Sequence, residues 1–241
     1  MKKKITMMFA SGILVLGLLA GTISTVFAYG GGNGNFGKGV GGSCYGDLCL
    51  NNSANADSTA LSDSETAGLM FMVEEEKLAR DVYQYLASRY SLAVFSNIAN
   101  SEQSHMDALL SIIENHGLTS PLSSEAGVFS NSNLQALYIE LTAKGSQSLA
   151  DALLVGGTIE EIDIRDLQSY IVATTNTSLA QVYTNLLNGS NNHLKAFVNE
   201  YESQTGAAYV PQYLDSVTFQ TAISSGTTHG GQGRGNARHG R

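Results

Sequence analysis

A glutamate and a histidine interrupt an apolar helical stripe between residues 95 and 112. Successive stripe positions are three or four residues apart, which places them on one face of a helix: Phe95, Ile98, Glu102, His105, Leu109 and Ile112. Glu102 and His105 therefore point the same way, about one turn apart, on a buried face where unpaired charge is costly. Helical bundles hold transition metals with this pairing of carboxylate and imidazole. Because Glu-x-x-His also occurs by chance, the rest of the chain has to decide whether it marks a site.

The composition favours long helices and argues against a nucleic-acid-binding domain. The chain has 241 residues, of which 43% are hydrophobic and only 2 are proline, so a sizeable core and uninterrupted helices are expected. The net charge is −8, and the lysines at positions 2–4 and the arginines near the end leave the middle of the chain more acidic still. The basic face that nucleic-acid-binding domains carry is therefore not expected.

The start of the chain has the pattern of an export signal. Residues 1–28 contain Lys2 to Lys4, then a largely apolar run, then Val26-Phe27-Ala28 before the expected cleavage position. Glycines and serines in the apolar run weaken a spanning helix, so we expect cleavage and no stable membrane span, against the alternative of an uncleaved anchor. The mature chain is then expected to be secreted or associated with the cell envelope.

Segments rich in small residues flank the expected domain. Residues 29–61 are rich in Gly, Asn and Ser and predict a flexible linker, in which Cys44 and Cys49 are expected to form a local disulfide rather than a metal site. Residues 225–241 form a Gly/Arg/His tail that we expect to be disordered. Residues 62–224 lie between them and show no strand-like alternation of useful length, which predicts an all-α domain.

Four long helices and one long crossover are expected in this domain. Apolar periodicity and capping residues predict helices at about 64–90, 93–116, 146–173 and 178–203, the first with Ser64 as its N-cap. The crossover between the second and third runs from about 118 to 145 and contains a short helix. A last short helix is expected at 216–224.

Two of the other long helices bring acids to their apolar side. The first carries three consecutive glutamates, and helical phase leaves open whether Glu75 or Glu76 points inward. The third carries Glu160 and Asp163 in the centre of its apolar stripe, flanked by Glu161. Both helices can therefore contribute carboxylates to the helix that carries Glu-x-x-His.

Positions along the helices place the polar side chains at one level. With a rise of about 1.5 Å per residue, Glu76 and the pair Glu102 and His105 both lie about 15–20 Å from the turn that joins their helices. Glu160 and His193, on the third and fourth helices, likewise lie at matching distances from the turn between them. Two hairpins that each bring acids and a histidine to one level indicate a single shared site.

The pattern resembles the ferritin-like superfamily, whose dimetal site takes a Glu from each of two helices and Glu-x-x-His from the other two. Glu76 followed by Tyr83 resembles the first helix of ferritins and rubrerythrins, which favours Glu76 over Glu75. Three stretches also resemble one bacterial and archaeal branch known as a domain of unknown function: 75–83, 101–108 and 189–197. The resemblance covers about residues 66 to 220. It implies an all-α ferritin-like four-helix bundle whose helices run up, down, down and up.

The chain departs from the superfamily pattern at one position. Ser190 stands where the fourth helix should present its glutamate, and Asp163, one turn after Glu160, could supply the missing carboxylate. The expected metal ligands are then Glu76, Glu102, His105, Glu160, Asp163 and His193. Four carboxylates and two imidazoles suit a dinuclear iron centre, with manganese as the alternative and zinc as a redox-inactive occupant. If Asp163 does not reach the metals, a mononuclear or vacant site is expected instead.

The resemblance implies a function that the residues leave open. In the first reading, the chain is an exported di-iron oxidoreductase, a ferroxidase or a peroxide or dioxygen reductase, with Tyr83 close enough to hydrogen-bond a ligand or pass an electron. In the second, it is a non-catalytic metal-binding or structural bundle at the cell envelope. Metal ions and these oxidants are the expected partners, and a homodimer is a candidate assembly.

Overall fold

The computed structural model describes residues 60–225, which form six α-helices and, within this range, no strand. The prediction of an all-α fold is confirmed for this part of the chain. The expected export signal, most of the linker with Cys44 and Cys49, and all but the first residue of the C-terminal tail lie outside the described residues. None of the described helices combines the length and the apolar character that are needed to cross a bilayer.

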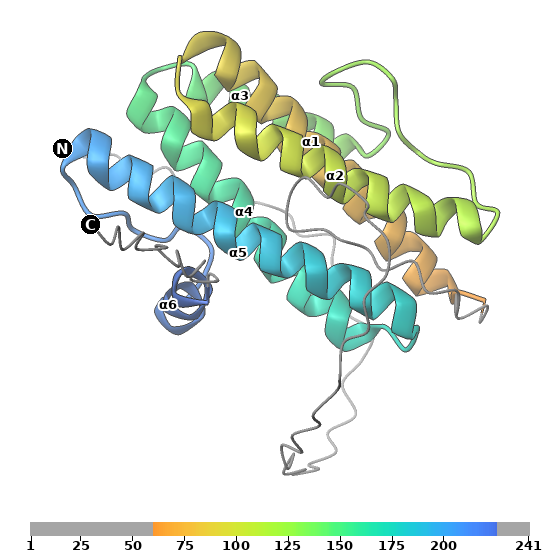
Figure 1. Cartoon of the computed structure of the whole chain (residues 1–241). Helices are drawn as coiled ribbons and strands as arrows, with labels where there is room; N and C mark the ends of the chain where they lie inside the picture. The colour runs from red at the N-terminus through yellow and green to blue at the C-terminus, as the bar shows by residue number, and fades with distance from the viewer. Residues whose placement is uncertain (1–59, 226–241) are drawn as a thin grey trace, which may run out of the picture. The chain divides into compact units, whose positions relative to one another are not determined.

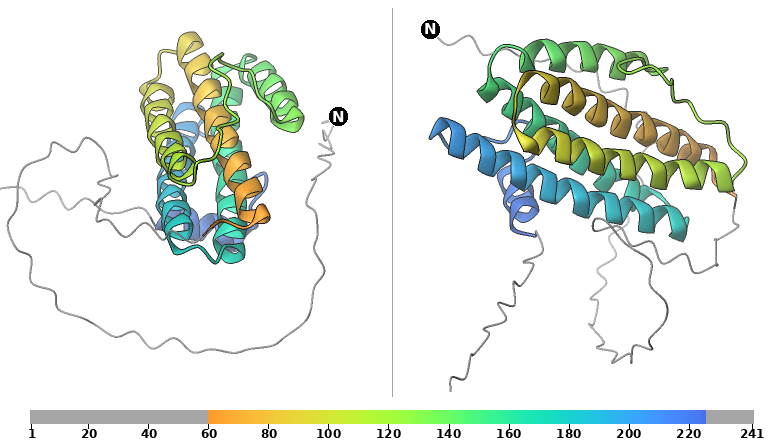
Figure 2. Two further views of the ribbon diagram at one scale, coloured as in Figure 1. Left: turned by 90° about the vertical axis from the view of Figure 1, so that its right-hand side faces the viewer. Right: turned by 45° about the horizontal axis from the view of Figure 1, so that its top comes forward.

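Four long helices lie side by side: α1 (Asp63–Arg89), α2 (Ala93–Asn115), α4 (Leu149–Ala173) and α5 (Thr177–Thr205) (Figure 1). α1 packs against α2 as one hairpin, and α4 packs against α5 as another. The hairpins meet where α2 contacts α5 and where α1 contacts α4, as the two views of Figure 2 show. Two shorter helices cover this arrangement. α3 (Ser132–Gly145) packs on α1 and α4, and α6 (Ser216–Ser224) packs on α5.

The first helix begins two residues earlier than expected, because Ser62 and not Ser64 is its N-cap. The Ser62 hydroxyl accepts from the Glu65 backbone at 3.2 Å, and the Glu65 carboxylate accepts from the Ser62 backbone at 2.9 Å, which forms a capping box. The same carboxylate accepts from the backbone N–H groups of Thr175 and Asn176 at 2.9 and 3.1 Å. It therefore ties the start of α1 to the turn between α4 and α5.

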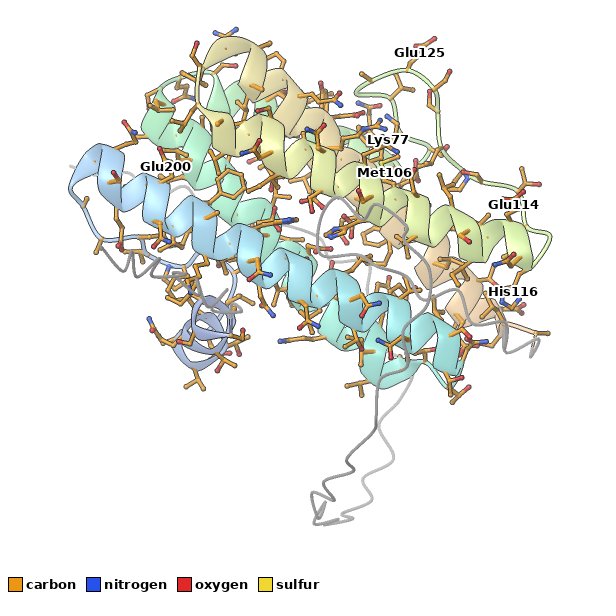
Figure 3. All side chains as sticks on the ribbon, viewed as in Figure 1. Lys77, Met106, Glu114, His116, Glu125 and Glu200 are labelled. Atoms are coloured by element: carbon orange, nitrogen blue, oxygen red, sulfur yellow. The ribbon has the colours of Figure 1, made fainter. Side chains whose placement is uncertain are left out.

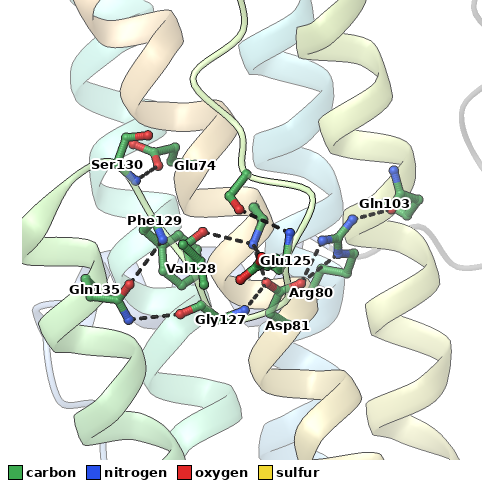
Figure 4. Close-up of polar contacts among 12 residues, drawn as sticks. Glu74, Arg80, Asp81, Gln103, Glu125, Gly127, Val128, Phe129, Ser130 and Gln135 are labelled. Carbon is green, nitrogen blue, oxygen red and sulfur yellow. Dashed lines mark hydrogen bonds and ion pairs between the residues drawn. The ribbon is translucent and has the colours of Figure 1, made fainter.

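Charged side chains of α1 fasten the crossover between α2 and α4 (Figure 4). The buried Lys77 ammonium donates to Asp81 at 2.6 Å and to two crossover carbonyls at 2.9 and 3.2 Å, while Asp81 accepts from a crossover N–H at 2.8 Å. Glu74 accepts from the backbone N–H groups of Ser130 and Asn131, at the start of α3, at 2.5 and 3.1 Å. Glu74 therefore has a structural partner, which separates it from the two glutamates that follow.

Two apolar clusters occupy the two halves of the helix assembly. One contains Leu78, Phe95, Leu153 and Phe197, and the other contains Leu69, Leu109, Leu167 and Leu186. Each cluster draws on all four long helices. In each of the four long helices, the expected metal ligands come after the residues of one cluster and before those of the other. These buried polar side chains therefore lie between two apolar layers.

Candidate metal centre

The structure brings together polar side chains from α1, α2, α4 and α5. All six expected ligands are buried, with exposed fractions of 0 to 8%: Glu76, Glu102, His105, Glu160, Asp163 and His193. The ligand atoms of Glu102, His105 and His193 lie within 4.8 Å of one another, which is close enough for one metal ion to contact all three. That these side chains bind a metal stays a prediction, but the clustering that it requires is present.

Glu102 stands between the two histidines. Its Oε2 lies 2.7 Å from His105 Nδ1, and its Oε1 lies 2.9 Å from His193 Nδ1. Although the second distance is short, neither atom of that pair is aligned for a hydrogen bond. The two oxygens of one carboxylate therefore face two different imidazole nitrogens, which is the arrangement expected of a bridging ligand.

Each histidine is oriented by what its other nitrogen meets. His193 Nε2 lies 2.9 Å from the Ser101 hydroxyl, so a proton on Nε2 would leave Nδ1 free to bind a metal. His105 turns Nε2 toward α5 at Gly189, where an added Cβ would come within 2.5 Å of that nitrogen. The absence of a side chain at Gly189 thus makes room for the ring and lets Nδ1 face the carboxylates.

The remaining carboxylates lie on either side of this trio. Glu76 Oε2 is 3.2 Å from His105 Nδ1, and Glu160 Oε2 is 3.5 Å from His193 Nδ1. The buried Tyr83 hydroxyl donates to Glu160 Oε1 at 2.5 Å, as the sequence led us to expect of a tyrosine close to the site. The two halves thus share Glu102 and each has one histidine and one further carboxylate.

Asp163 is buried near Glu76 and Glu160 and is hydrogen-bonded to Ser190. The Ser190 hydroxyl donates to Asp163 Oδ2, while Asp163 Oδ1 is buried without a partner. The serine that replaces the expected helix-four glutamate therefore holds the α4 carboxylate that could stand in for it.

The protonation of the cluster follows from its burial and from the number of carboxyl groups that it contains. Burial raises the pKa of Glu76 to about 8, and burial together with the charge of Glu102 raises the pKa of Glu160 to about 7. Burial also opposes charge on the histidines, but the neighbouring carboxylates outweigh it and raise the pKa of His193 to about 10 and that of His105 well above its usual range. In Glu102, burial alone would raise the pKa, but the two imidazolium charges outweigh it and lower the pKa. Without metal, the histidines and the outer carboxyls of the site therefore keep their protons to a higher pH than such groups usually do.

Buried atoms without hydrogen-bond partners provide the test of fit to a metal. Apart from His105 Nε2, which faces Gly189, four of the six expected ligands contribute such an atom: Glu76 Oε1, Glu102 Oε1, Asp163 Oδ1 and His193 Nδ1. Buried polar groups without partners are uncommon in native proteins, and a bound ion is one accepted explanation. Carboxylate and imidazole donors suit iron and manganese, so the donor set and the unpartnered atoms agree.

Two glutamates that the sequence left as alternatives have other surroundings. The carboxylate of Glu161 accepts from Tyr209 and from the backbone N–H groups of residues 212, 213 and 214 at 2.6 to 3.0 Å, so it anchors the segment before α6. Glu75 is buried and has an oxygen without a partner, but no contact joins it to the histidines. The geometry therefore favours Glu160 over Glu161 and Glu76 over Glu75.

The sequence interpretation missed two residues that position the histidines. Ser101 directly precedes Glu102, off the apolar stripe that we followed, so its contact with α5 had no signal in the periodicity of α2. Gly189 did have a signal, because a glycine inside a helix costs about 1 kcal/mol relative to alanine and often marks a close approach. At the other end of α2, His116 is the C-cap, apart from the site (Figure 3).

Comparisons with known proteins find relatives of the described domain. Residues 65–226 match the family described as an uncharacterized protein domain, DUF2202. The chain is 45% identical over 171 residues to the uncharacterized protein MJ0754 of Methanocaldococcus jannaschii, across 70% of this chain and 92% of that protein. The crystal structure of the hypothetical protein MJ0754 matches with a TM-score of 0.67 and 45% identity, across 70% of this chain and 96% of that one.

Proposed function

The chain belongs to the DUF2202 family, and we propose that it is a ferritin-like metalloprotein with a dinuclear centre, iron in the first place, between α1, α2, α4 and α5. The observation that carries the proposal is the Glu102 carboxylate, whose two oxygens face the Nδ1 atoms of His105 and His193 at 2.7 and 2.9 Å. One metal position would be held by Glu76, Glu102 and His105. The other would be held by Glu102, Glu160 and His193, and Asp163 would complete the set.

The direction of the helices supports the ferritin-like assignment. α1 and α2 form a hairpin, and so do α4 and α5. Contacts of Gly68 with Tyr170 and of Tyr83 with Gly156 support an antiparallel arrangement of α1 and α4. The long helices, taken in chain order, are then proposed to run up, down, down and up, with the crossover and α3 between the second and the third.

A bound pair of irons would supply one-electron steps and open coordination positions for dioxygen or peroxide. The residues of the chain supply the surroundings for this chemistry. Burial and the charge of Glu160 raise the pKa of Tyr83 well above its usual range, so its hydroxyl stays protonated and holds Glu160 in place. The apolar clusters on both sides exclude bulk water. A ferroxidase or a peroxide-reducing oxidoreductase is therefore the activity that we propose.

The export pattern of residues 1–28 supports a secreted or cell-envelope location, which we propose together with the activity. One observation favours the second candidate, a non-catalytic metal-binding or structural bundle. Ser190 engages Asp163, and if this carboxyl stays with the serine, the second metal position has one carboxylate fewer.

Metal analysis and turnover test the proposal. The purified full chain, freed of metal with a chelator and reloaded anaerobically with Fe²⁺, is expected to retain about two irons and to consume hydrogen peroxide or dioxygen faster than free Fe²⁺ does. Retention of metal without turnover would support the non-catalytic candidate. A chain that retains no iron and whose melting temperature does not change on iron addition would contradict the metal centre and leave only the structural bundle.

A further inference from the structure

Glu75 is a buried carboxylate that neither the proposed centre nor the crossover uses. It is 4% exposed, and its Oε2 has no hydrogen-bond partner. Its neighbours in sequence are accounted for, because Glu74 accepts from the backbone at the start of α3 and Glu76 contacts His105. Burying a carboxylate without a partner is costly, so this side chain calls for an explanation.

The contacts between α1 and α4 fix what Glu75 faces. Near the start of α1, an added Cβ on Gly68 would lie 2.6 Å from the Tyr170 ring of α4. Two turns beyond Glu75, the Tyr83 hydroxyl donates to the Gly156 carbonyl of α4 at 3.2 Å. As the α1 numbers rise, the α4 numbers fall by nearly the same amount, as they do in antiparallel helices.

Midway between these two contacts, the register of the helices puts Glu75 at the level of Asp163. Asp163 is 6% exposed, and its Oδ1 is also without a partner, since Ser190 holds the other oxygen. One turn further along α4, Asp166 is only partly buried and pairs with Arg165 at 2.8 Å. Two facing helices thus each bring a buried carboxylate with an unpartnered oxygen to one level, next to a partly exposed ion pair.

We infer that Glu75 and Asp163 form a cation uptake site, through which a divalent metal ion passes between α1 and α4 to the buried centre. This inference rests on the proposed metal centre, because Asp163 belongs to both. An ion held between the two carboxylates can move inward by exchanging Glu75 for the ligands of the centre while it keeps Asp163. Arg165 pairs with Asp166 at 2.8 Å, and among the described residues no cation forms an ion pair with Glu75, so an incoming ion would be the first that Glu75 binds.

The opposite side of the site is less suited to cations. His193 lies there, 8% exposed, where its Nε2 contacts Ser101 of α2. Residues 93–101 of α2 and 177–192 of α5 contain no Asp, Glu, Lys or Arg. A surface lined by charges of one sign raises the local concentration of an oppositely charged ion and its rate of association. These stretches of α2 and α5 provide no such charges. The α1–α4 side therefore provides the carboxyl groups that uptake needs.

The rate of metal loading separates an uptake site from a ligand of the centre. Full chains freed of metal are mixed with Co²⁺ in a stopped-flow instrument, and the visible absorbance of bound cobalt is followed to its end point. We compare the wild type with Glu75→Gln, which keeps the shape of the side chain and removes its charge, and with Glu114→Gln, an exposed control on α2 (Figure 3). Melting temperatures of the metal-free chains verify that all three are folded.

For Glu75→Gln we expect loading slowed about tenfold or more, with the same final cobalt content as the wild type. Loading within twofold of the wild-type rate would overturn the uptake site and leave the metal centre untouched. A lower final content would make Glu75 a ligand of the centre and would also overturn it, as would equal slowing in Glu114→Gln. A wild-type chain that binds no cobalt would overturn both the centre and its uptake site.

Discussion

The imidazole rings of His105 and His193 stack, with centroids 5.4 Å apart and planes inclined by 26°. The rings come from α2 and α5, which belong to different hairpins, and both turn Nδ1 toward the same carboxylate. The Glu102 carboxylate thus contacts both halves of the proposed centre. A change at Glu102 should affect both metal positions, whereas a change at either histidine should affect mainly one.

Glu102→Gln is expected to reduce the bound metal from about two ions per chain to nearly none. The amide lacks the charge that bridges two cations, and we expect affinity at each position to fall about 100-fold or more. His105→Ala should retain roughly one ion. Metal content after dialysis, measured by mass spectrometry, distinguishes these results, with Glu114→Gln and His116→Ala on the same helix as controls. Equal content in all variants would show that the metal binds elsewhere.

Metal affinity is expected to rise with pH between about 6 and 8. In the metal-free site, the pKa values of Glu160, Glu76 and His193 are raised to about 7, about 8 and about 10. A metal binds the deprotonated groups, so protons compete with it below these values and compete less as the pH rises. Calorimetric titration with Mn²⁺ in two buffers of different ionisation enthalpy should show release of more than one proton per ion at pH 7. Binding without proton release would contradict the protonated cluster.

Ser101→Ala should weaken one metal position without unfolding the chain. Its hydroxyl lies 2.9 Å from His193 Nε2 and holds the ring so that Nδ1 faces the site. Loss of such a supporting contact typically weakens metal binding about 10- to 100-fold. Titration with Co²⁺ should then show one weakened and one unchanged class of site. Ser104→Ala, an exposed serine on the same helix, is the control, and equal binding curves for both would argue against the role of Ser101.

Substitutions of two adjacent glutamates of α4 are expected to have different effects, one on stability and the other on metal content. Glu161→Ala removes the acceptor for the Tyr209 hydroxyl and for three backbone N–H groups, and we expect the free energy of unfolding to fall by about 3 kcal/mol. Glu160→Gln should lower the metal content, while the metal-free chain stays within about 1 kcal/mol of the wild type. Urea unfolding and metal analysis of both variants check this contrast. The reverse pattern would exchange the assignments of the two residues.

Much of the site followed from helix geometry, and the resemblance to ferritins and rubrerythrins favoured Glu76 over Glu75. Steps of three and four residues put Glu102 and His105 on the buried stripe, and a fixed rise per residue brought Glu76, Glu160 and His193 to the same level. These are properties of a helix as such, so they could be obtained before any packing was known. The N-cap was placed wrongly, since Ser62 and Ser64 are both suitable cap residues and only the reciprocal bonds with Glu65 distinguish them.

The sequence by itself determined that the chain forms long helices with acids and histidines on their inner faces at one level, because local periodicity and helix geometry decide such features. Only the tertiary structure decided which glutamate of each run faces the site. Residues 74–76 differ by 100° steps around a helix, and the long flexible side chains blur that difference, so the choice depends on what packs opposite. Packing between helices likewise distinguishes Glu160 from Glu161. It also brings Ser101 of α2 to His193 of α5, and Gly189 of α5 to His105 of α2.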